Sequence, residues 1–281
     1  MNHRQVAYIM LAPAFGFFLL FSCLPLGLVC YLSFFKTNYI ATTFIGLGNF
    51  AKAIADPAFR QAIVNTLIYA ATIMIPVVTF SVFISLFVFN MPRWVHNYTR
   101  FVFYAPMFSA GVIISTVWRW IFHPRAGLAN YLLSLFGAGP ISWFGNGLRA
   151  IGCVSLTIIV ATLGVQIMIL LAAMLAIDRS IFDQARIDGA GWIAIKLRII
   201  LPIVAPVIAL LSLVQLIGSM QIWEAILLLT NGGPAGGSAS MMFDVYKTGF
   251  IYGEYGLASA KSLVMLVVIL ALAMIKRRIE R

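Results

Sequence analysis

Residues 150–177 read AIGCVSLTIIVATLGVQIMILLAAMLAI, and this run of 28 residues contains no charged side chain. About 20 consecutive apolar residues are enough for a helix to cross the hydrocarbon core of a bilayer. The run shows no period-two alternation of apolar and polar residues, and a lone strand in lipid would leave its backbone groups unpaired. The stretch therefore predicts a transmembrane helix.

The same reasoning, applied outward from this run, gives six predicted transmembrane helices. Of the 281 residues, 62% are apolar and 10% are charged, and the mean hydropathy is +1.01. A soluble domain holds about 25% charged residues, so this composition indicates an all-α integral membrane protein. The length suits a single transmembrane domain over residues 1–281, with no separate catalytic or nucleotide-binding domain. The predicted spans are 6–34, 62–89, 101–122, 150–177, 203–230 and 255–275.

Basic residues in the connections predict the orientation of the helices. If the N-terminus lies inside, eleven Lys and Arg residues fall on the inner side and seven on the outer side, with Arg119 inside the third span. The positive-inside rule then places both termini in the cytoplasm. The net charge of +11 reflects membrane anchoring rather than nucleic-acid binding. The inner group is Arg4, Arg93, Arg100, Arg179, Arg186, Lys196, Arg198, Lys276, Arg277, Arg278 and Arg281; the outer group is Lys36, Lys52, Arg60, Arg125, Arg149, Lys247 and Lys261.

The sequence lacks the motifs of several functional classes. It has no G-x-x-x-x-G-K-[ST] phosphate-binding loop, and the glycine-rich stretch 232–238 contains no lysine. It has no H-E-x-x-H or G-x-S-x-G motif and no cluster of carboxylates, which argues against an enzyme. Cys23, Cys30 and Cys153 lie in apolar runs at spacings that suit neither a disulfide framework nor a zinc site. No metal or cofactor is therefore expected in this chain.

The inner connection between the fourth and fifth spans, residues 178–202, differs from the others. It carries three of the chain's eight acidic residues, and Ile181, Phe182 and Ala185 recur at helical spacing. The pattern predicts an amphipathic helix on the cytoplasmic face. A simple interfacial anchor and a surface that receives force from a partner both fit such a helix.

Three functions can be compared with the residues alone. An ion- or proton-coupled carrier acting by itself would need ionisable groups at mid-membrane or inverted repeats. Neither is visible, because Arg119, Glu224 and Lys261 all lie toward the outer ends of their spans. A non-transporting scaffold gives no reason for a long inner loop helix. The pattern favours the third function, a membrane subunit that transports but takes its energy from a partner.

The loop sequence FDQARIDGA at 182–190, followed by Leu201 and Pro202, resembles the EAA loop of bacterial binding-protein-dependent ABC importer permeases. The family pattern is roughly E-A-A-x-x-D-G-A and, further on, L-P, and the interval from Asp188 to Pro202 agrees with it. Asp183 stands where the family usually has glutamate, and Gln184 where it has the first alanine. Aspartate keeps the charge with a shorter reach.

Further landmarks resemble the carbohydrate-uptake branch of that family, in the family's order. This branch includes the maltose- and glycerol-3-phosphate-type systems, and the chain resembles the first of their two permeases. It lacks the large outer insertion and the extra N-terminal spans of the maltose member. The landmarks are residues 31–35, 46–50, 65–67, 106–107, 118–122, 127–130, 230–234 and 255–260.

The resemblance implies a type I ABC importer permease fold in a bacterial inner membrane, with a set of partners. A second permease, as a rule a different chain, would complete the pathway for a carbohydrate or polyol derivative. An ATPase dimer that uses ATP and Mg²⁺ would dock below, and an extracytoplasmic binding protein would deliver the solute. In the family the EAA helix fits a cleft of the ATPase. The ATPase-coupling residues implied here are Phe182, Asp183, Ala185, Asp188 and Gly189.

For two positions of this loop, local backbone geometry also explains the type of residue. Glycine at position 189 suits the left-handed residue that ends many helices. Proline at position 202 suits the first turn of the next span.

Maltose-type permeases line their solute path with polar and aromatic side chains, which implies a candidate pathway here. Gln215 and Ser219 are four residues apart and share a helix face. Sugar hydroxyls need such hydrogen-bond partners, and an aromatic ring suits the apolar face of a sugar. The same polar groups could instead tie helices together. The candidate pathway residues are Thr162, Gln166, Gln215, Ser219, Gln221, Trp223 and Glu224.

Lys261 departs from the uncharged residue that is usual in its stretch of the family. Together with Arg119 it would bias the outer cavity toward an anionic solute, such as a uronate oligosaccharide or a phosphorylated polyol. The alternative is that both side chains snorkel to the outer interface.

Overall fold

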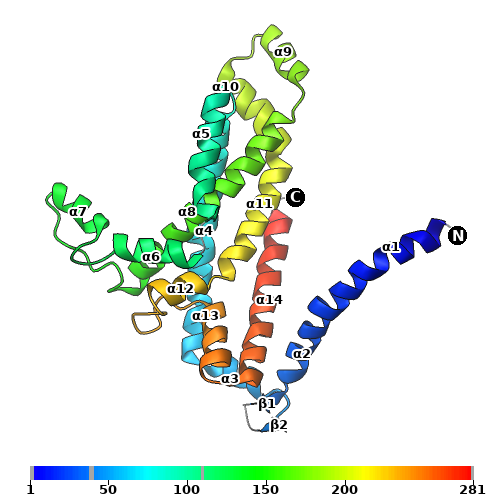
Figure 1. Ribbon diagram of the computed structural model, residues 1–281, viewed down its shortest axis with the longest axis vertical. Helices are drawn as coiled ribbons and strands as arrows, with labels where there is room; N and C mark the ends of the chain where they lie inside the picture. Colours follow the sequence, from blue (N-terminus) through cyan, green and yellow to red (C-terminus); the bar gives the residue numbers. More distant parts are fainter. Residues whose placement is uncertain (1–2, 38–40, 109–110, 280–281) are drawn as a thin grey trace. The chain divides into compact units, whose positions relative to one another are not determined.

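The computed structural model describes residues 3–37, 41–108 and 111–279 (Figure 1). Positions 109–110 of the third predicted span, and Arg281 of the inner basic group, lie outside the described residues. The chain forms two compact units, Met1–Arg60 with Asp244–Val268, and Gln61–Phe243 with Ile269–Arg281. The prediction that 1–281 forms a single transmembrane domain stays a prediction.

Five helices of the described chain are long and apolar enough to cross a membrane. Four of them coincide closely with predicted spans, so the prediction of an α-helical membrane protein is confirmed. The predicted number of six spans is not confirmed, because the third segment differs. The five helices are Met10–Leu32, Pro57–Val88, Gly147–Leu175, Trp192–Met220 and Tyr255–Arg278.

The third predicted span, residues 101–122, is not one continuous helix. It is divided among α5 (Arg93–Tyr104), the 3₁₀ turn η2 (Ala105–Phe108) and α6 (Gly111–Ile121). Pro106 lies in the turn, where it lacks the N–H that an α-helix would need. α6 has 11 residues and runs at a steep angle to α5 (Figure 1).

The fifth span lies earlier in the sequence than its prediction of 203–230. It runs continuously through α10 (Trp192–Ala194), the π-helical turn η3 (Ile195–Ile200) and α11 (Leu201–Met220). Pro202 is the second residue of α11, yet the helix does not begin there. A proline ring collides with the carbonyl four residues earlier in a regular helix, and the wider π turn just before it gives that carbonyl room.

A similar π turn precedes a proline in the first span. This span consists of α1 (His3–Phe18), the π turn η1 (Leu19–Cys23) and α2 (Leu24–Leu32), with Pro25 at the start of α2. None of the side chains in its most apolar stretch is buried against the rest of the chain.

The rest of the first unit consists of a hairpin, the helix α3, the π turn η4 and parts of three further helices. In the hairpin, Phe35 of one strand pairs with Phe44 of the other in antiparallel register. The buried side chain of Asn49 donates hydrogen bonds to the carbonyls of Ser33 (2.9 Å) and Phe35 (2.8 Å), which joins the helix that carries Asn49 to the end of α2. The elements are β1 (Phe35–Thr37), β2 (Thr42–Phe44), α3 (Gly48–Ala55), the first turn of α4 (Pro57–Val88), the end of α13 (Met241–Tyr246), the π turn η4 (Lys247–Ile251) and the start of α14 (Tyr255–Ile279).

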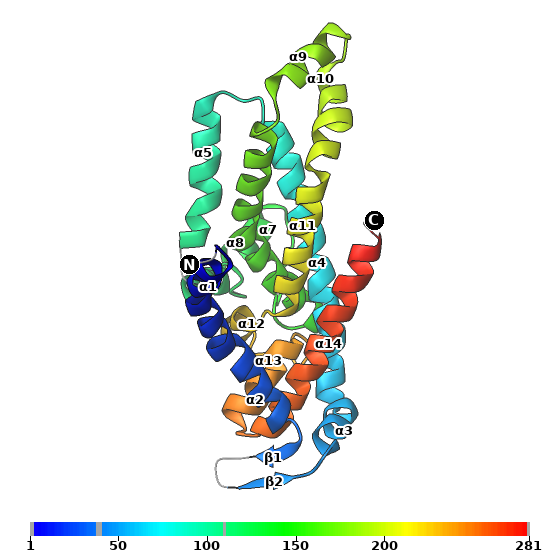
Figure 2. The same cartoon turned by 90° about the vertical axis from the view of Figure 1, so that its right-hand side faces the viewer.

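In the second unit α4, α8 (Gly147–Leu175) and α11 run side by side (Figures 1 and 2). Tyr69 of α4 and Ile151 of α8 belong to one buried apolar cluster, together with residues of α12. Hydroxyl contacts add to this packing, as where the Thr72 and Ser155 hydroxyls lie 2.8 Å apart. Lipid supplies no hydrophobic force between helices, so such close packing and polar contacts hold a membrane bundle together. The remaining helices of this unit are α7 (Leu128–Leu135), α9 (Arg179–Ile187) and α12 (Glu224–Leu229).

Candidate functional site: a coupling helix and a transport pocket

The predicted amphipathic helix of the 178–202 loop is present as α9, at one end of the second unit (Figures 1 and 2). Asp178 begins it, because its carboxylate accepts a 2.9 Å hydrogen bond from the backbone N–H of Ser180. This bond, together with the Ser180 hydroxyl, holds the pKa of Asp178 below its ordinary value.

Gly189 ends the same helix in the left-handed conformation, with φ of +78°. The N–H of Ala190 donates to the carbonyl of Ala185 (2.8 Å), and the N–H of Gly189 donates to that of Arg186 (3.0 Å). This pair of bonds is the Schellman arrangement, which needs a residue at positive φ. The expected glycine cap is therefore confirmed.

One face of α9 is buried against the body of the second unit. Phe182 and Ala185 lie in a cluster with Met174 at the end of α8 and Ile195 in η3. The ring of Phe182 also meets Phe89 edge-on, with centroids 5.7 Å apart. Two of the five predicted coupling residues thus connect the helix to the two spans that flank it.

The opposite face of α9 is exposed. Asp183 lies on it, and Asp188 and Gly189, which are also exposed, follow directly after the last residue of the helix. The exposed face also carries Ile187, which is 86% exposed and was not among the predicted residues. Its signal in the sequence was an apolar side chain off the apolar face of the helix. Ile187 takes no part in the buried cluster beneath α9 and is available for contact with a partner.

A second site forms where α6, α8, α11 and α12 meet. It is a pocket of about 220 Å³, and the predicted residues Gln221, Trp223 and Glu224 line it. The carboxylate of Glu224 lies where a side chain on Gly111 would be, 3.0 Å from that Cβ position. An amide, an indole and a carboxylate around one pocket are suited to the hydroxyls and the apolar face of a sugar.

The other four predicted pathway residues do not line this pocket. The Gln166 side-chain N–H donates to the Gln215 carbonyl oxygen at 2.8 Å, and both residues are buried, so this pair ties α8 to α11. The hydroxyl of Ser219 donates to Leu216 and that of Thr162 donates to Ile158, each within its own helix. A role for these four in the pathway stays a prediction.

Known proteins resemble the chain over nearly its whole length, although no family model matches it. A probable ABC transporter permease of Bacillus subtilis, YurN, is 28% identical over 99% of this chain and 96% of its own. The sulfoquinovosyl glycerol transport system permease SmoG of Agrobacterium fabrum is 27% identical over 100% of this chain and 92% of its own. The trehalose/maltose transport system permease MalF of Thermococcus litoralis is 24% identical over 100% and 95%.

The homologues of this chain are carbohydrate ABC transporter permeases. Two solved structures carry the same fold, both from bacterial alginate ABC transporters. One, in complex with a periplasmic protein that holds an alginate pentasaccharide, has a TM-score of 0.86 at 22% identity and covers 99% of this chain and 94% of that chain. The other has a TM-score of 0.85 at 22% identity. The permease homologues and the five apolar helices make this a multi-pass membrane protein, and its relatives are transport subunits rather than enzymes.

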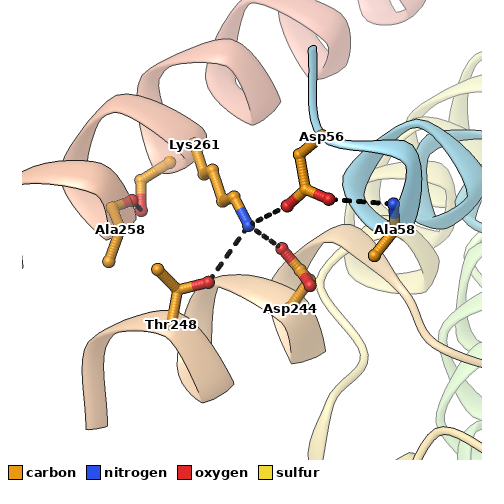
Figure 3. Close-up of polar contacts among 7 residues, drawn as sticks. Asp56, Ala58, Asp244, Thr248, Ala258 and Lys261 are labelled. Atoms are coloured by element: carbon orange, nitrogen blue, oxygen red, sulfur yellow. Dashed lines mark hydrogen bonds and ion pairs between the residues drawn. The ribbon is translucent and has the colours of Figure 1, made fainter. Parts of the chain in front are cut away.

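Within this permease fold, the two predicted anion-contact residues have different surroundings. Arg119 is exposed in the last turn of α6, where a cation suits the negative end of the helix dipole. Lys261 is 3% exposed and forms ion pairs with Asp56 and Asp244 (Figure 3). The snorkelling alternative is therefore wrong for Lys261, and its role toward a solute stays untested.

Sequence reasoning missed a network of hydrogen bonds that holds the loop 230–240 against α4. The Asn65 side chain donates to the carbonyls of Gly236 (3.1 Å) and Ala239 (2.9 Å). One turn along α4, the Tyr69 hydroxyl donates to the Ser238 carbonyl at 2.9 Å. The spacing of Asn65 and Tyr69, four residues apart in an apolar run, was the available signal.

Proposed function

We propose that this chain is one permease subunit of an ATP-driven, binding-protein-dependent importer for a carbohydrate or polyol derivative. The observation that carries the proposal is α9, a helix with its apolar face packed against two spans and its charged face exposed. A second permease, an ATPase dimer and an extracytoplasmic binding protein complete the transporter. ATP and Mg²⁺ are used by the ATPase, and this chain contributes no catalytic residue.

The proposal includes six membrane crossings with both termini in the cytoplasm of a bacterial cell. α5, η2 and α6 together make the third crossing, although α6 alone is too short for one. Irregular backbone at membrane depth is tolerated where protein covers it, and α6 packs against both α8 and α12. α9 then lies on the cytoplasmic side and the pocket around Glu224 toward the outer side.

The exposed and buried faces of α9 have separate parts in this function. Asp183, Asp188 and Ile187, next to the Gly189 cap, contact the ATPase. Phe182 and Ala185 pass the movement of the helix to α8 and to the start of the Trp192–Met220 span, because they pack against both. A stiff, close-packed joint suits this task, since packed side chains transmit displacement with little loss.

The pocket lined by Gln221, Trp223 and Glu224 is the part of the pathway that contacts the solute. A volume of about 220 Å³ fits about one sugar ring rather than a whole oligosaccharide, so the second permease would supply the other wall. A carboxylate in the pocket accepts hydrogen bonds from hydroxyls and disfavours a negative group at the same place.

Two measurements test the proposal. The first is mass spectrometry of the chain purified from its native membranes in mild detergent, which should recover a second permease and an ATPase. The second compares the ATPase activity of the complex carrying Gly189→Pro with wild type. Proline cannot adopt φ of +78°, so this variant should lose assembly or turnover.

A matched control is Gly137→Pro, which replaces a glycine of similar φ, +74°, just after α7. Proline is equally strained there but lies far along the chain from α9, so ATPase docking should be retained. Recovery of the chain without an ATPase, together with equal activity in both variants, would overturn the importer proposal in favour of a carrier that acts alone.

A further inference from the structure

Lys261 is the buried centre of a polar cluster that the proposed transport function does not use. Its ammonium donates hydrogen bonds to Asp244 Oδ2 at 2.6 Å, Asp56 Oδ2 at 2.9 Å and Thr248 Oγ1 at 3.1 Å. The four side chains come from three places in the first unit: the turn between α3 and α4, the α13–η4 segment, and α14 (Figure 3). Bonds from one atom to several elements fix these elements relative to one another.

The surroundings of the ammonium leave it no free N–H group for a solute. A lysine ammonium has three N–H groups, and the two carboxylates and the hydroxyl engage all of them. The ring of Phe59 in the first turn of α4 lies 5.2 Å from the nitrogen and is itself buried. An anionic solute would have to displace a carboxylate to reach Lys261.

Asp56 links this cluster to the beginning of a span. Its other carboxylate oxygen accepts a 2.9 Å hydrogen bond from the backbone N–H of Ala58 in the first turn of α4. Burial raises the pKa of Asp56, whereas the hydrogen bond and charge of Lys261 and the N–H groups of Ala58 and Phe59 lower it. The lowering effects together are larger, so the pKa lies below its ordinary value. An ionised Asp56 thus joins the N-terminus of α4 to α14.

The start of α14 is held on another side as well. Gly256 approaches the carbonyl of Phe35 and the Asn49 amide so closely that a Cβ would have no room. The same Asn49 amide bonds to the carbonyls of Ser33 and Phe35. The first turns of α14 therefore lack the freedom to tilt away from β1 or from α4 within this unit.

We propose that Lys261 is a positioning residue that makes the starts of α4 and α14 one rigid element, so that these two ends move together during transport. The proposal rests on the transport function proposed above. It also explains why a span contains a lysine without requiring a solute contact, because Asp56 and Asp244 of the same unit balance its charge. We call the cluster of Asp56, Asp244, Thr248 and Lys261 the lysine clasp.

The first test measures a distance and needs no change to the clasp. Spin labels are attached to cysteines replacing Arg60 on α4 and Glu254 directly before α14, which are both exposed. The background carries Cys23→Ser and Cys30→Ser, because these two cysteines are exposed, whereas Cys153 is buried. The complete transporter is studied at rest and trapped with ATP and vanadate, after solute uptake by the same preparation has been demonstrated.

A distance that stays narrow and unchanged between the two states supports the clasp. A main distance that shifts between the states overturns it, because the two helix starts would then separate during the cycle. Uptake by the wild-type preparation tests the proposed function itself, so the failure of that function is distinguished from the failure of the clasp.

The second test changes the charges. Lys261→Met leaves two partly buried carboxylates without their cation, and we expect at least about a tenfold loss of solute uptake per ATP hydrolysed. Lys261→Arg keeps a cation and should retain most of the uptake. The control is Lys52→Met, which removes an exposed lysine of α3 in the same unit and should leave uptake unchanged.

A triple variant separates positioning from simple stability. Lys261→Met with Asp56→Asn and Asp244→Asn removes every charge, and asparagine still caps α4. Assembly should return to the wild-type level, while uptake per ATP should stay reduced and the label distance should broaden. Wild-type uptake in this variant would overturn the proposal, and so would a KM that rises for anionic solutes alone. If Lys261→Met fails to assemble, the triple variant and the label distances in the wild-type background decide whether the clasp couples the two helix starts.

Discussion

Phe182 and Ile187 lie on opposite faces of α9. Their positions separate two proposed tasks of the EAA-like loop, which are to pack against the spans and to dock the ATPase. Phe182 is packed between α8 and the start of the next span, whereas Ile187 projects away from the chain. A change at the first position affects the joint inside the permease. A change at the second affects only what docks from outside.

At Phe182 we expect a loss of coupling with the ATPase still bound. Phe182→Ala leaves a cavity beneath α9, which costs about 3 kcal/mol in a well-packed site. The helix should loosen, so hydrogen exchange in residues 179–187 should speed up and solute-stimulated ATPase activity should fall. Unchanged exchange in α9 would show that the Phe89 contact does not hold the helix.

At Ile187 we expect the reverse. Ile187→Asp should weaken the association with the ATPase at least about tenfold, as for a central interface residue, and leave the thermal stability of the isolated chain unchanged. Co-purification at graded detergent and salt concentrations measures the association. A comparison with Phe182→Ala shows whether the two faces act separately, and equal ATPase recovery in both variants would contradict the division.

Asp178 gives a prediction about pH. Its pKa is lower in the folded helix than its ordinary value of 3.8. The stability that Asp178 gives to α9 is therefore complete above pH 3.8 and is lost as the pH falls through the lower pKa of the folded state. Asp178→Ala should fray the start of α9 at neutral pH, while Asp178→Asn should not, because asparagine also caps helices. Hydrogen exchange of the first turn measures both, and wild type should approach Asp178→Ala only well below pH 4.

At the residue level, the sequence indicated roles where a local pattern decides them. The glycine cap at 189 follows from a motif. The polar group of Gln221, Trp223 and Glu224 was predicted from its place toward the outer end of the fifth predicted span. The partners of Lys261 could not be predicted in this way, since Asp56 lies 205 residues away. Nothing in the neighbourhood of either residue in the sequence specifies that contact.

Among the elements, α8 is the helix that the others pack against, and one glycine allows the closest approach. The Cα of Gly164 touches the carbonyl of Phe103 in α5, where a Cβ would overlap that oxygen. Small residues of this kind let two backbones come together in a membrane.

We therefore expect Gly164→Leu to push α5 away from α8 and to destabilise the chain by about 1–3 kcal/mol, as for an overpacked core. The matched control is Gly152→Leu on the same helix, because Gly152 has open space around its Cβ position. Thermal unfolding in detergent compares the two. Equal midpoints would mean that α5 does not depend on this contact.

Span boundaries were predictable where composition alone decides them and wrong where backbone chemistry intervenes. The run at 150–177 matches α8 closely because it has one apolar character from end to end. The fifth span was placed too late, because Pro202 was expected to begin a helix. The π turn at Ile195–Ile200 lets the helix continue through the proline, and no residue pattern announces such a turn.

For the whole molecule, the proposed topology predicts which surface each loop reaches. A cysteine replacing Gln184 on α9 should react with a membrane-impermeant maleimide only from the cytoplasmic side. A cysteine replacing Ala138, in the connection after α7, should react only from outside. Labelling of intact cells against inverted vesicles, in the background without Cys23 and Cys30, measures both. Reaction of both positions from one side would contradict the crossing by α8, which is the span between them. Reaction of position 138 from the cytoplasmic side would remove the third crossing through α5 and α6.

The first span and α4 also differ in when they can reach their final state during synthesis. The apolar stretch of Met10–Leu32 buries no side chain against this chain, so it can settle in lipid as soon as the ribosome has delivered it. Asn65 of α4 has to wait for Gly236 and Ala239, which are made 171 and 174 residues later. For most of translation, the amide N–H groups of Asn65 therefore lack these two partners within the bilayer or the insertion machinery, although its oxygen can already accept a hydrogen bond from Gln61 one turn earlier. A protein that shelters polar side chains of half-made chains would act on this helix, and not on the first one.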